Sequence, residues 1–158
     1  MKSNLISKSE TASIMKHISE EWKIELPKIK NLRFHHISDN EIIITGDGIT
    51  AIKIGDKILP HLSEIELLKK FPYIIVDMGA IKFVCKGANI MRPGITKLTD
   101  FDVGEIICVV EESNNKFLSV GITMMSSDMA NSTKTGIVVE NLHYISDKFW
   151  ETKKEIND

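Results

Sequence analysis

The feature that most limits how this chain can fold is a series of short β-prone runs separated by tight turns. Three such runs follow one another in the first half, and their connections are rich in Gly, Asp and Asn: 32–37, 41–45 and 49–54. These residue types tolerate the positive φ angles of short hairpin turns. The pattern predicts an antiparallel meander. No apolar run approaches the ~20 residues needed to cross a bilayer.

Helical spacing flanks the meander. Ser7 and Glu10 have capping-box spacing, and Ile14, Ile18 and Trp22 recur on one helical stripe. These residues predict an amphipathic helix over 8–22, whose stripe we expect to pack between the two halves of the chain. A second short helix is predicted over 64–70, because a Ser-x-x-Glu spacing opens it and a proline follows.

The pattern restarts at residue 73 with a short apolar run typical of a buried strand. The sequence of the second half then predicts a two-turn helix over 79–86 and strands over 106–110 and 117–124. After these it predicts a short helix or loop over 126–132, a last strand over 136–144 and a terminal helix over 146–154. Many short strands with few helices indicate a partly closed barrel with helices at its rim. We therefore expect an α+β fold, in which a small α/β meander domain (1–72) packs on a β-pseudobarrel domain (73–158).

Charge is nearly balanced overall but unevenly placed. Twenty Lys and Arg residues oppose 22 Asp and Glu residues, which gives a formal net charge of −2 and excludes a strongly basic nucleic-acid tail. Within 81–99, however, there are four cations and no acid: Lys82, Lys86, Arg92 and Lys97. Several acids follow directly, within 100–112. The cationic block is consistent with a solvated face or with an anion-binding surface.

Residues that could carry catalysis or bind a metal form no recognisable pattern. Cys85 and Cys108 are expected to be buried or half-buried thiols, and His35 and His36 are adjacent, so a strand would point them to opposite faces. The chain has no nucleophile elbow, phosphate-binding loop or zinc-ligand spacing. We expect no enzyme activity, cofactor or metal. The polar first ten residues do not resemble a secretory signal, and we expect a cytoplasmic protein.

Two apolar residues within the cationic block have two interpretations each. Phe83 could lie in the core or form a stacking platform for a base, and the core is favoured. Met91 could likewise lie in the core or against a base. The chain has no aromatic signature of an RNA-recognition motif.

The same region carries a family resemblance. Residues 79–94, GAIKFVCKGANIMRPG, resemble the signature of a PUA domain, an RNA-binding module. Glycines at 121 and 136 fall where that module has its later strands, and residues 139–150, VENLHYISDKFW, resemble the ending of the malignant-T-cell-amplified-sequence family. Members of that family pair a small N-terminal domain with a C-terminal PUA domain.

The resemblance implies a β-pseudobarrel that binds RNA along its first helix, the following loop and the edge of the last strand. Carried onto this chain, the RNA-binding candidates are Lys82, Lys86, Gly87, Ala88, Asn89, Met91, Arg92, Pro93, Gly94, Lys134 and Gly136. It further implies a role in translation: contact with a tRNA acceptor end or ribosomal RNA, binding to the small ribosomal subunit, and a separate density-regulated-type initiation partner. Two alternatives are a recognition subunit for a separate RNA-modifying enzyme and a protein-interaction module without an RNA role.

Overall fold

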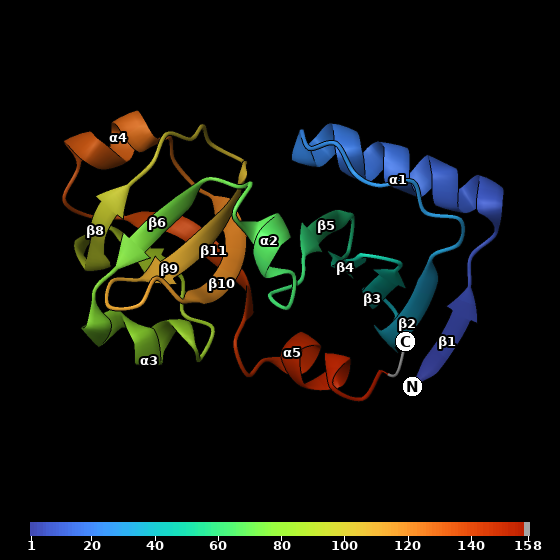
Figure 1. Ribbon diagram of the computed structural model, residues 1–158. Coiled ribbons are helices and arrows are strands. Elements are labelled where there is room, and N and C mark those ends of the chain that lie inside the picture. The colour runs from blue at the N-terminus through green and yellow to red at the C-terminus, as the bar shows by residue number, and fades with distance from the viewer. Residues whose placement is uncertain (157–158) are drawn as a thin grey trace.

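The protein contains two β-sheets that lie side by side (Figure 1). The structure is a computed structural model, and it describes residues 1–156. The first sheet has five antiparallel strands in the spatial order β1-β2-β3-β4-β5. They are β1 (Lys2–Leu5), β2 (Arg33–Ser38), β3 (Glu41–Gly46), β4 (Ile49–Ile54) and β5 (Lys57–Pro60). The predicted meander is confirmed, and β1 and β5 are strands that sequence analysis missed.

Helix α1 (Lys8–Trp22) covers one face of this sheet, and its predicted bounds are confirmed (Figure 1). The side chain of Ser7 accepts a hydrogen bond from the Glu10 N–H at 3.2 Å, which satisfies a donor at the helix start. Ile18 is fully buried, and the Trp22 indole donates to the Ile58 carbonyl at 2.9 Å. The helix packs this stripe on its own meander, and Ile18 and Trp22 belong to a hydrophobic cluster that also includes Cys108 and Val120 of the second half, so the stripe contributes to the core between the halves as expected.

The second sheet curls into a nearly closed barrel with the strand order β7-β11-β10-β9-β6-β8. Its strands are β6 (Tyr73–Val76), β7 (Ile90–Met91), β8 (Ile95–Leu98), β9 (Ile106–Glu111), β10 (Phe117–Thr123) and β11 (Ile137–Tyr144). Among the described strands of this sheet, β6 and β9 are the one parallel pair. Sequence analysis missed β7 and β8, which are very short. The expected α+β class with a barrel-like second half is confirmed.

The remaining helices of the described residues are short. They are α2 (Ile65–Leu68), η1 (Met78–Ala80), α3 (Ile81–Val84), η2 (Arg92–Gly94), α4 (Ser127–Ser132) and α5 (Lys148–Lys153). The predicted helix over 79–86 is thus a 3₁₀ turn followed by one α-helical turn. Within the described residues, no helix is both long and apolar enough to span a membrane.

Helix α5 ties the two halves together, because it follows the last barrel strand yet packs on the first sheet (Figure 1). Lys148 forms an ion pair with Glu41 on β3, and Phe149 is buried in the same hydrophobic cluster as the meander. Cys108 and Val120 of the barrel also belong to that cluster. The expectation that the halves pack on each other is confirmed.

Candidate nucleic-acid interface

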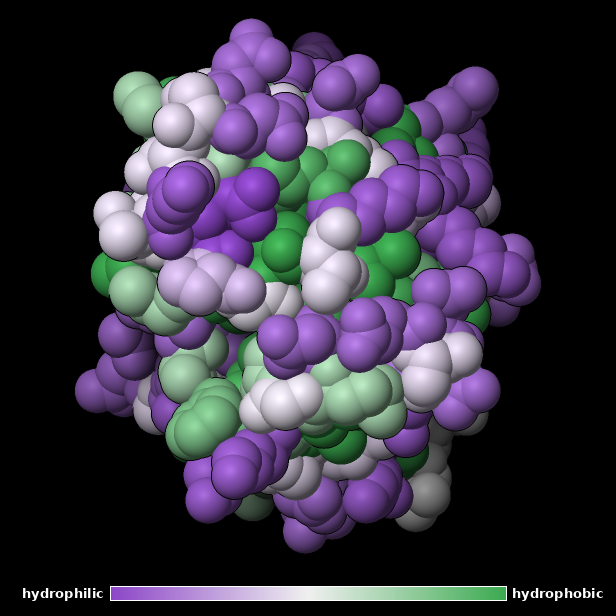
Figure 2. All heavy atoms as spheres, turned by 90° about the vertical axis from the view of Figure 1, so that its left-hand side faces the viewer, coloured by the Kyte–Doolittle hydropathy of each residue, from purple (hydrophilic) through white to green (hydrophobic). Residues whose placement is uncertain are grey.

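An open groove of about 590 Å³ lies at the end of the barrel, between α3 and the β7–η2 segment. Phe83, Met91 and Pro93 are among the side chains that line it. Figure 2 views the end of the molecule that carries α3, β8 and α4, where hydrophobic atoms are open to solvent and hydrophilic atoms surround them. Five of the eleven residues that the PUA resemblance singled out line this groove: Ala88, Asn89, Met91, Pro93 and Gly94.

The turn that ends helix α3 requires a glycine at position 87. Gly87 has φ +93°, its N–H donates to the Val84 carbonyl at 3.0 Å, and the Ala88 N–H donates to the Phe83 carbonyl at 3.1 Å. This pair of bonds is a Schellman motif, which satisfies carbonyls at a helix end. A Cβ at this position would also lie 3.0 Å from the Tyr144 ring. Gly87 is therefore held against β11, while the exposed Lys82 and Lys86 flank it.

The loop after α3 is fastened to β11 by an asparagine that sequence analysis missed. The Asn141 side-chain amide donates to the carbonyls of Val84 and Ala88, each at 3.0 Å. In return, the Asn141 backbone N–H donates to the Asn89 side-chain oxygen at 3.0 Å. An asparagine inside a strand is an unfavourable choice for packing alone, and that is the one signal that could have identified it. Asn89, predicted to contact RNA, thus positions the loop.

The Arg92 side chain is hydrogen-bonded to the protein's own backbone. Its side chain donates to the carbonyls of Ala130 and Ile95, which fixes η2 against α4. Its backbone N–H donates to the Gly136 carbonyl at 2.9 Å, which places Arg92 beside the start of β11. Because these bonds occupy part of the guanidinium, Arg92 is chiefly a positioning residue that adds positive charge to the site.

The remaining candidates lie on the surface around this groove and at the start of β11. Met91, Pro93 and Lys134 are exposed, and Gly94 and Gly136 are half-buried. Gly136 has φ +103°, a conformation that favours glycine, and it leads directly into β11.

Phe83 corrects one expectation. It was favoured as a core residue, but 57% of its surface is exposed, and Met91 is 48% exposed. The Lys82 ammonium lies 5.2 Å from the centre of the Phe83 ring. A one-turn helix buries only one direction, and Val84 occupies it here. Phe83 therefore offers an exposed aromatic face beside a cation, which is the combination that binds a stacked base.

The separation of charges seen in the sequence is only partly kept in space. Lys97 does not join the groove, because it points to Tyr73, with its ammonium 3.4 Å from the phenol oxygen. Glu112, from the acidic stretch, accepts a hydrogen bond from the Met78 N–H at 3.2 Å. On the segments that form or adjoin the groove, Lys82 and Lys86 are exposed on and just after α3, Lys134 is exposed just before β11, and Arg92 is partly bonded.

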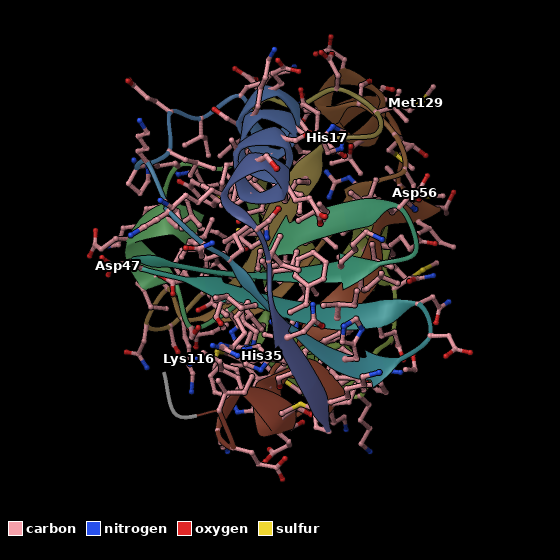
Figure 3. The ribbon with its side chains drawn as sticks, turned by 90° about the vertical axis from the view of Figure 1, so that its right-hand side faces the viewer. His17, His35, Asp47, Asp56, Lys116 and Met129 are labelled. Carbon is pink, nitrogen blue, oxygen red and sulfur yellow. The ribbon has the colours of Figure 1, made fainter. Side chains whose placement is uncertain are left out.

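The two cysteines are free thiols that are shielded from solvent to different degrees. Cys85 is half-buried, and burial raises the pKa of the Cys108 thiol to about 12. His17 and His35 come from different elements and lie well apart in Figure 3. Across residues 1–156, no three His, Cys, Asp or Glu side chains gather as metal ligands.

Comparison with known proteins agrees with this geometry. The PUA domain family model matches residues 72–145. An uncharacterised protein of Methanocaldococcus jannaschii is 37% identical over 133 residues, which span 81% of this chain and 80% of that protein. Malignant T-cell-amplified sequence 1-A of Xenopus laevis is 39% identical over 143 residues, 85% of this chain and 78% of the relative. Matches to several mammalian relatives span only 56% of those proteins.

Among solved structures, a hypothetical protein of Pyrococcus horikoshii aligns with a TM-score of 0.81 at 27% identity, over 96% of this chain and 99% of that one. The fold and the barrel-end groove thus define a PUA-domain protein with an N-terminal antiparallel sheet. The chain belongs to the malignant T-cell-amplified sequence family. A PUA domain in this setting supports RNA binding as its general function.

Proposed function

We propose that this protein acts in translation by binding a tRNA acceptor end or small-subunit ribosomal RNA at the barrel-end groove. The observation that carries the proposal is the groove itself, where Phe83 and Met91 are exposed, the Lys82 ammonium lies 5.2 Å from the Phe83 ring centre, and a preformed loop follows the exposed Lys86. Lys82, Lys86 and Lys134 would neutralise phosphates, and Phe83 and Met91 would hold an unpaired 3′ base. Gly87 and Ala88 present little side chain, so a sugar–phosphate backbone can approach the loop.

The proposal includes a wider setting. The chain would work in the cytoplasm on the small ribosomal subunit, with a separate density-regulated-type partner, and would bind without catalysing a reaction. It would divide into an N-terminal domain (1–72) and a PUA domain (73–158), although α5 packs back on the first of these. Similarity to malignant T-cell-amplified sequence proteins supports this wider setting.

The test is tRNA binding by the full chain over a range of salt concentrations. Lys82→Glu with Lys86→Glu removes two phosphate contacts, so affinity at low salt is expected to fall at least about tenfold. Affinity falls as salt rises, and the slope of log affinity against log salt concentration is expected to become less negative by roughly 1.5. Arg92 is left unchanged, because its substitution would also break bonds within the protein.

The matched control is Lys2→Glu with Lys53→Glu, which changes the net charge equally on the first sheet. It is expected to keep tRNA affinity within about twofold. A tRNA that lacks its 3′ CCA is expected to bind the wild-type protein more weakly than the intact tRNA. Equal loss in both charge variants, or no loss in either, would reject the barrel-end groove as the RNA site.

A further inference from the structure

The N-terminal half carries a second groove, which the RNA proposal does not use. It lies between α1 and the segment 24–32 that runs back alongside this helix (Figure 1), and its volume is about 730 Å³. Four lysines line it, and no acidic side chain among the described residues does: Lys8, Lys16, Lys28 and Lys30. We call this feature the α1 groove.

The α1 groove is built into the fold, because both ends of the segment are fastened to α1. At one end, the Ser19 hydroxyl donates to the Ile24 carbonyl at 2.6 Å. At the other end, the Leu32 N–H donates to the Thr11 hydroxyl oxygen at 3.0 Å. The middle of the segment is therefore held at a fixed distance from α1. Because the groove is already formed, ligand binding costs little free energy for ordering its backbone.

The floor of the α1 groove is apolar. Ala12 and Met15 come from α1, Leu26, Pro27 and Ile29 come from the segment, and the one polar residue beside them, Ser19, has its hydroxyl bonded to the Ile24 carbonyl. Within residues 1–156, no aromatic side chain lines it. A nucleic-acid backbone has no apolar group that could be buried against this floor, and the floor provides no aromatic ring on which a base could stack.

The rim of the α1 groove is cationic and free. None of its four lysines forms an ion pair with any residue between 1 and 156. Their ammonium groups are thus available to a partner, whose carboxylates would gain from all four at once. An apolar floor with a basic rim complements a segment that has apolar residues on one face and acidic residues on the other.

We propose that the α1 groove binds an acidic amphipathic helix of a partner protein. Such a helix lays its apolar face on the floor and turns its carboxylates towards the lysine rim, the mode by which grooves commonly capture helices. The site is separate from the barrel-end groove in residues and in chemistry. A partner helix and RNA are therefore bound independently.

The test measures the binding of a fluorescent 18-residue peptide by anisotropy with the full-length protein. The peptide has leucines at i, i+3, i+4 and i+7 spacing and glutamates elsewhere, and it is expected to bind with a Kd in roughly the micromolar range typical of a short helix. A scrambled peptide of equal composition lacks the apolar face. It is expected to bind at least tenfold more weakly.

Two variants examine the rim and the floor separately. Lys16→Glu with Lys28→Glu reverses two rim charges, and Ala12→Glu adds a carboxylate at an exposed floor position that tolerates a helix former. Each is expected to weaken peptide binding at least tenfold. The control Lys2→Glu with Lys53→Glu is expected to keep the affinity within about twofold, and thermal unfolding confirms that all variants fold.

Three outcomes would overturn the proposal. They are failure of the acidic peptide to bind, equal binding of the scrambled peptide, and loss of tRNA affinity instead of peptide affinity in the Lys16/Lys28 variant. The last outcome would assign the α1 groove to RNA. Because tRNA binding is measured in parallel on Lys82→Glu with Lys86→Glu, failure at the barrel-end groove is recognised separately.

Discussion

At the scale of single residues, Gly87 meets two requirements at once. Its φ of +93° is costly for any residue with a Cβ, by roughly 1–2 kcal/mol. An added Cβ would also press on the Tyr144 ring at 3.0 Å. We predict that Gly87→Ala lowers the free energy of unfolding by about 2 kcal/mol or more, as measured by urea denaturation.

Gly55 provides the matched control for this prediction. It also has a positive φ, +60°, but a Cβ there would meet nothing within 4 Å. Gly55→Ala is therefore expected to lower the free energy of unfolding by roughly 1 kcal/mol, from the strained backbone conformation alone. If both variants lose the same stability, the contact with Tyr144 contributes nothing.

At the scale of elements, α5 depends on one carboxylate at its start. Asp147 accepts hydrogen bonds from the backbone N–H groups of Trp150 and Tyr144 and from the His143 ring, at 2.8–2.9 Å. Burial raises the pKa of Asp147, but these hydrogen bonds outweigh burial and hold it below its ordinary value. Asp147 therefore joins the last barrel strand to the terminal helix as an ionised group.

We predict that Asp147→Asn costs about 2–3 kcal/mol of unfolding free energy, because the new amide turns a donor towards donors that are already buried. Ser7→Ala provides the comparison, since it removes a single exposed cap from α1 and is expected to cost only about 1 kcal/mol. Equal losses in a denaturant titration would mean that Asp147 acts as an ordinary helix cap.

How much of the molecule could be predicted depended on how local the signal is. Helix α1 was predicted to the residue, because its cap and its stripe lie within one short stretch. Strands β1, β5, β7 and β8 were missed, since each is defined by pairing with a distant strand and carries little periodicity of its own.

The candidate site shows the same limit. The groove-lining residues Ala88, Met91, Pro93 and Gly94 were predicted from a contiguous motif. The roles of Asn141 and Arg92 required the fold, because each of them bonds carbonyls that lie far away in sequence. Phe83 was misplaced, since its sequence alone does not show which side of a one-turn helix is buried.

At the scale of the whole molecule, Cys108 reports whether the two halves separate. It is fully buried, it belongs to the cluster shared by both sheets, and its thiol lies 3.7 Å from the Leu68 carbonyl oxygen. Because burial raises its pKa to about 12, almost no reactive thiolate forms near neutral pH.

We predict that a thiol reagent at pH 8 labels the half-buried Cys85 first and Cys108 only as fast as the molecule opens. Cys85→Ser is expected to remove the fast phase and to leave the slow one. Labelling of Cys108 at the rate of Cys85 would show that the halves separate freely in the native state.

The joint between the halves also contains two buried imidazoles. The His143 Nε2 atom accepts from the Leu62 N–H, and the His61 Nε2–H donates to the Phe149 carbonyl at 3.1 Å. The ring centres of His61 and His143 are 4.7 Å apart. Burial and the neighbouring His143 lower the pKa of His61 to about 4, from an ordinary value near 6.5.

This pKa sets a pH window for the stability of the whole protein. Below about pH 6.5, His61 binds a proton in the unfolded chain, whereas in the folded chain it does so only near pH 4. Its contribution is complete above pH 6.5 and is lost as the pH falls towards 4, by up to roughly 3 kcal/mol. Asp147 adds a loss only at still lower pH, because its pKa lies below its ordinary value.

We predict that His61→Gln flattens this dependence, because glutamine can still donate towards the Phe149 carbonyl but takes up no proton. Urea midpoints between pH 7.5 and pH 4.5 are expected to fall steeply for the wild-type protein and much less for the variant. The variant starts from lower stability at pH 7.5, so the two curves converge as the pH falls. Parallel curves would place the acid sensitivity outside His61 and leave the joint insensitive to pH in this range.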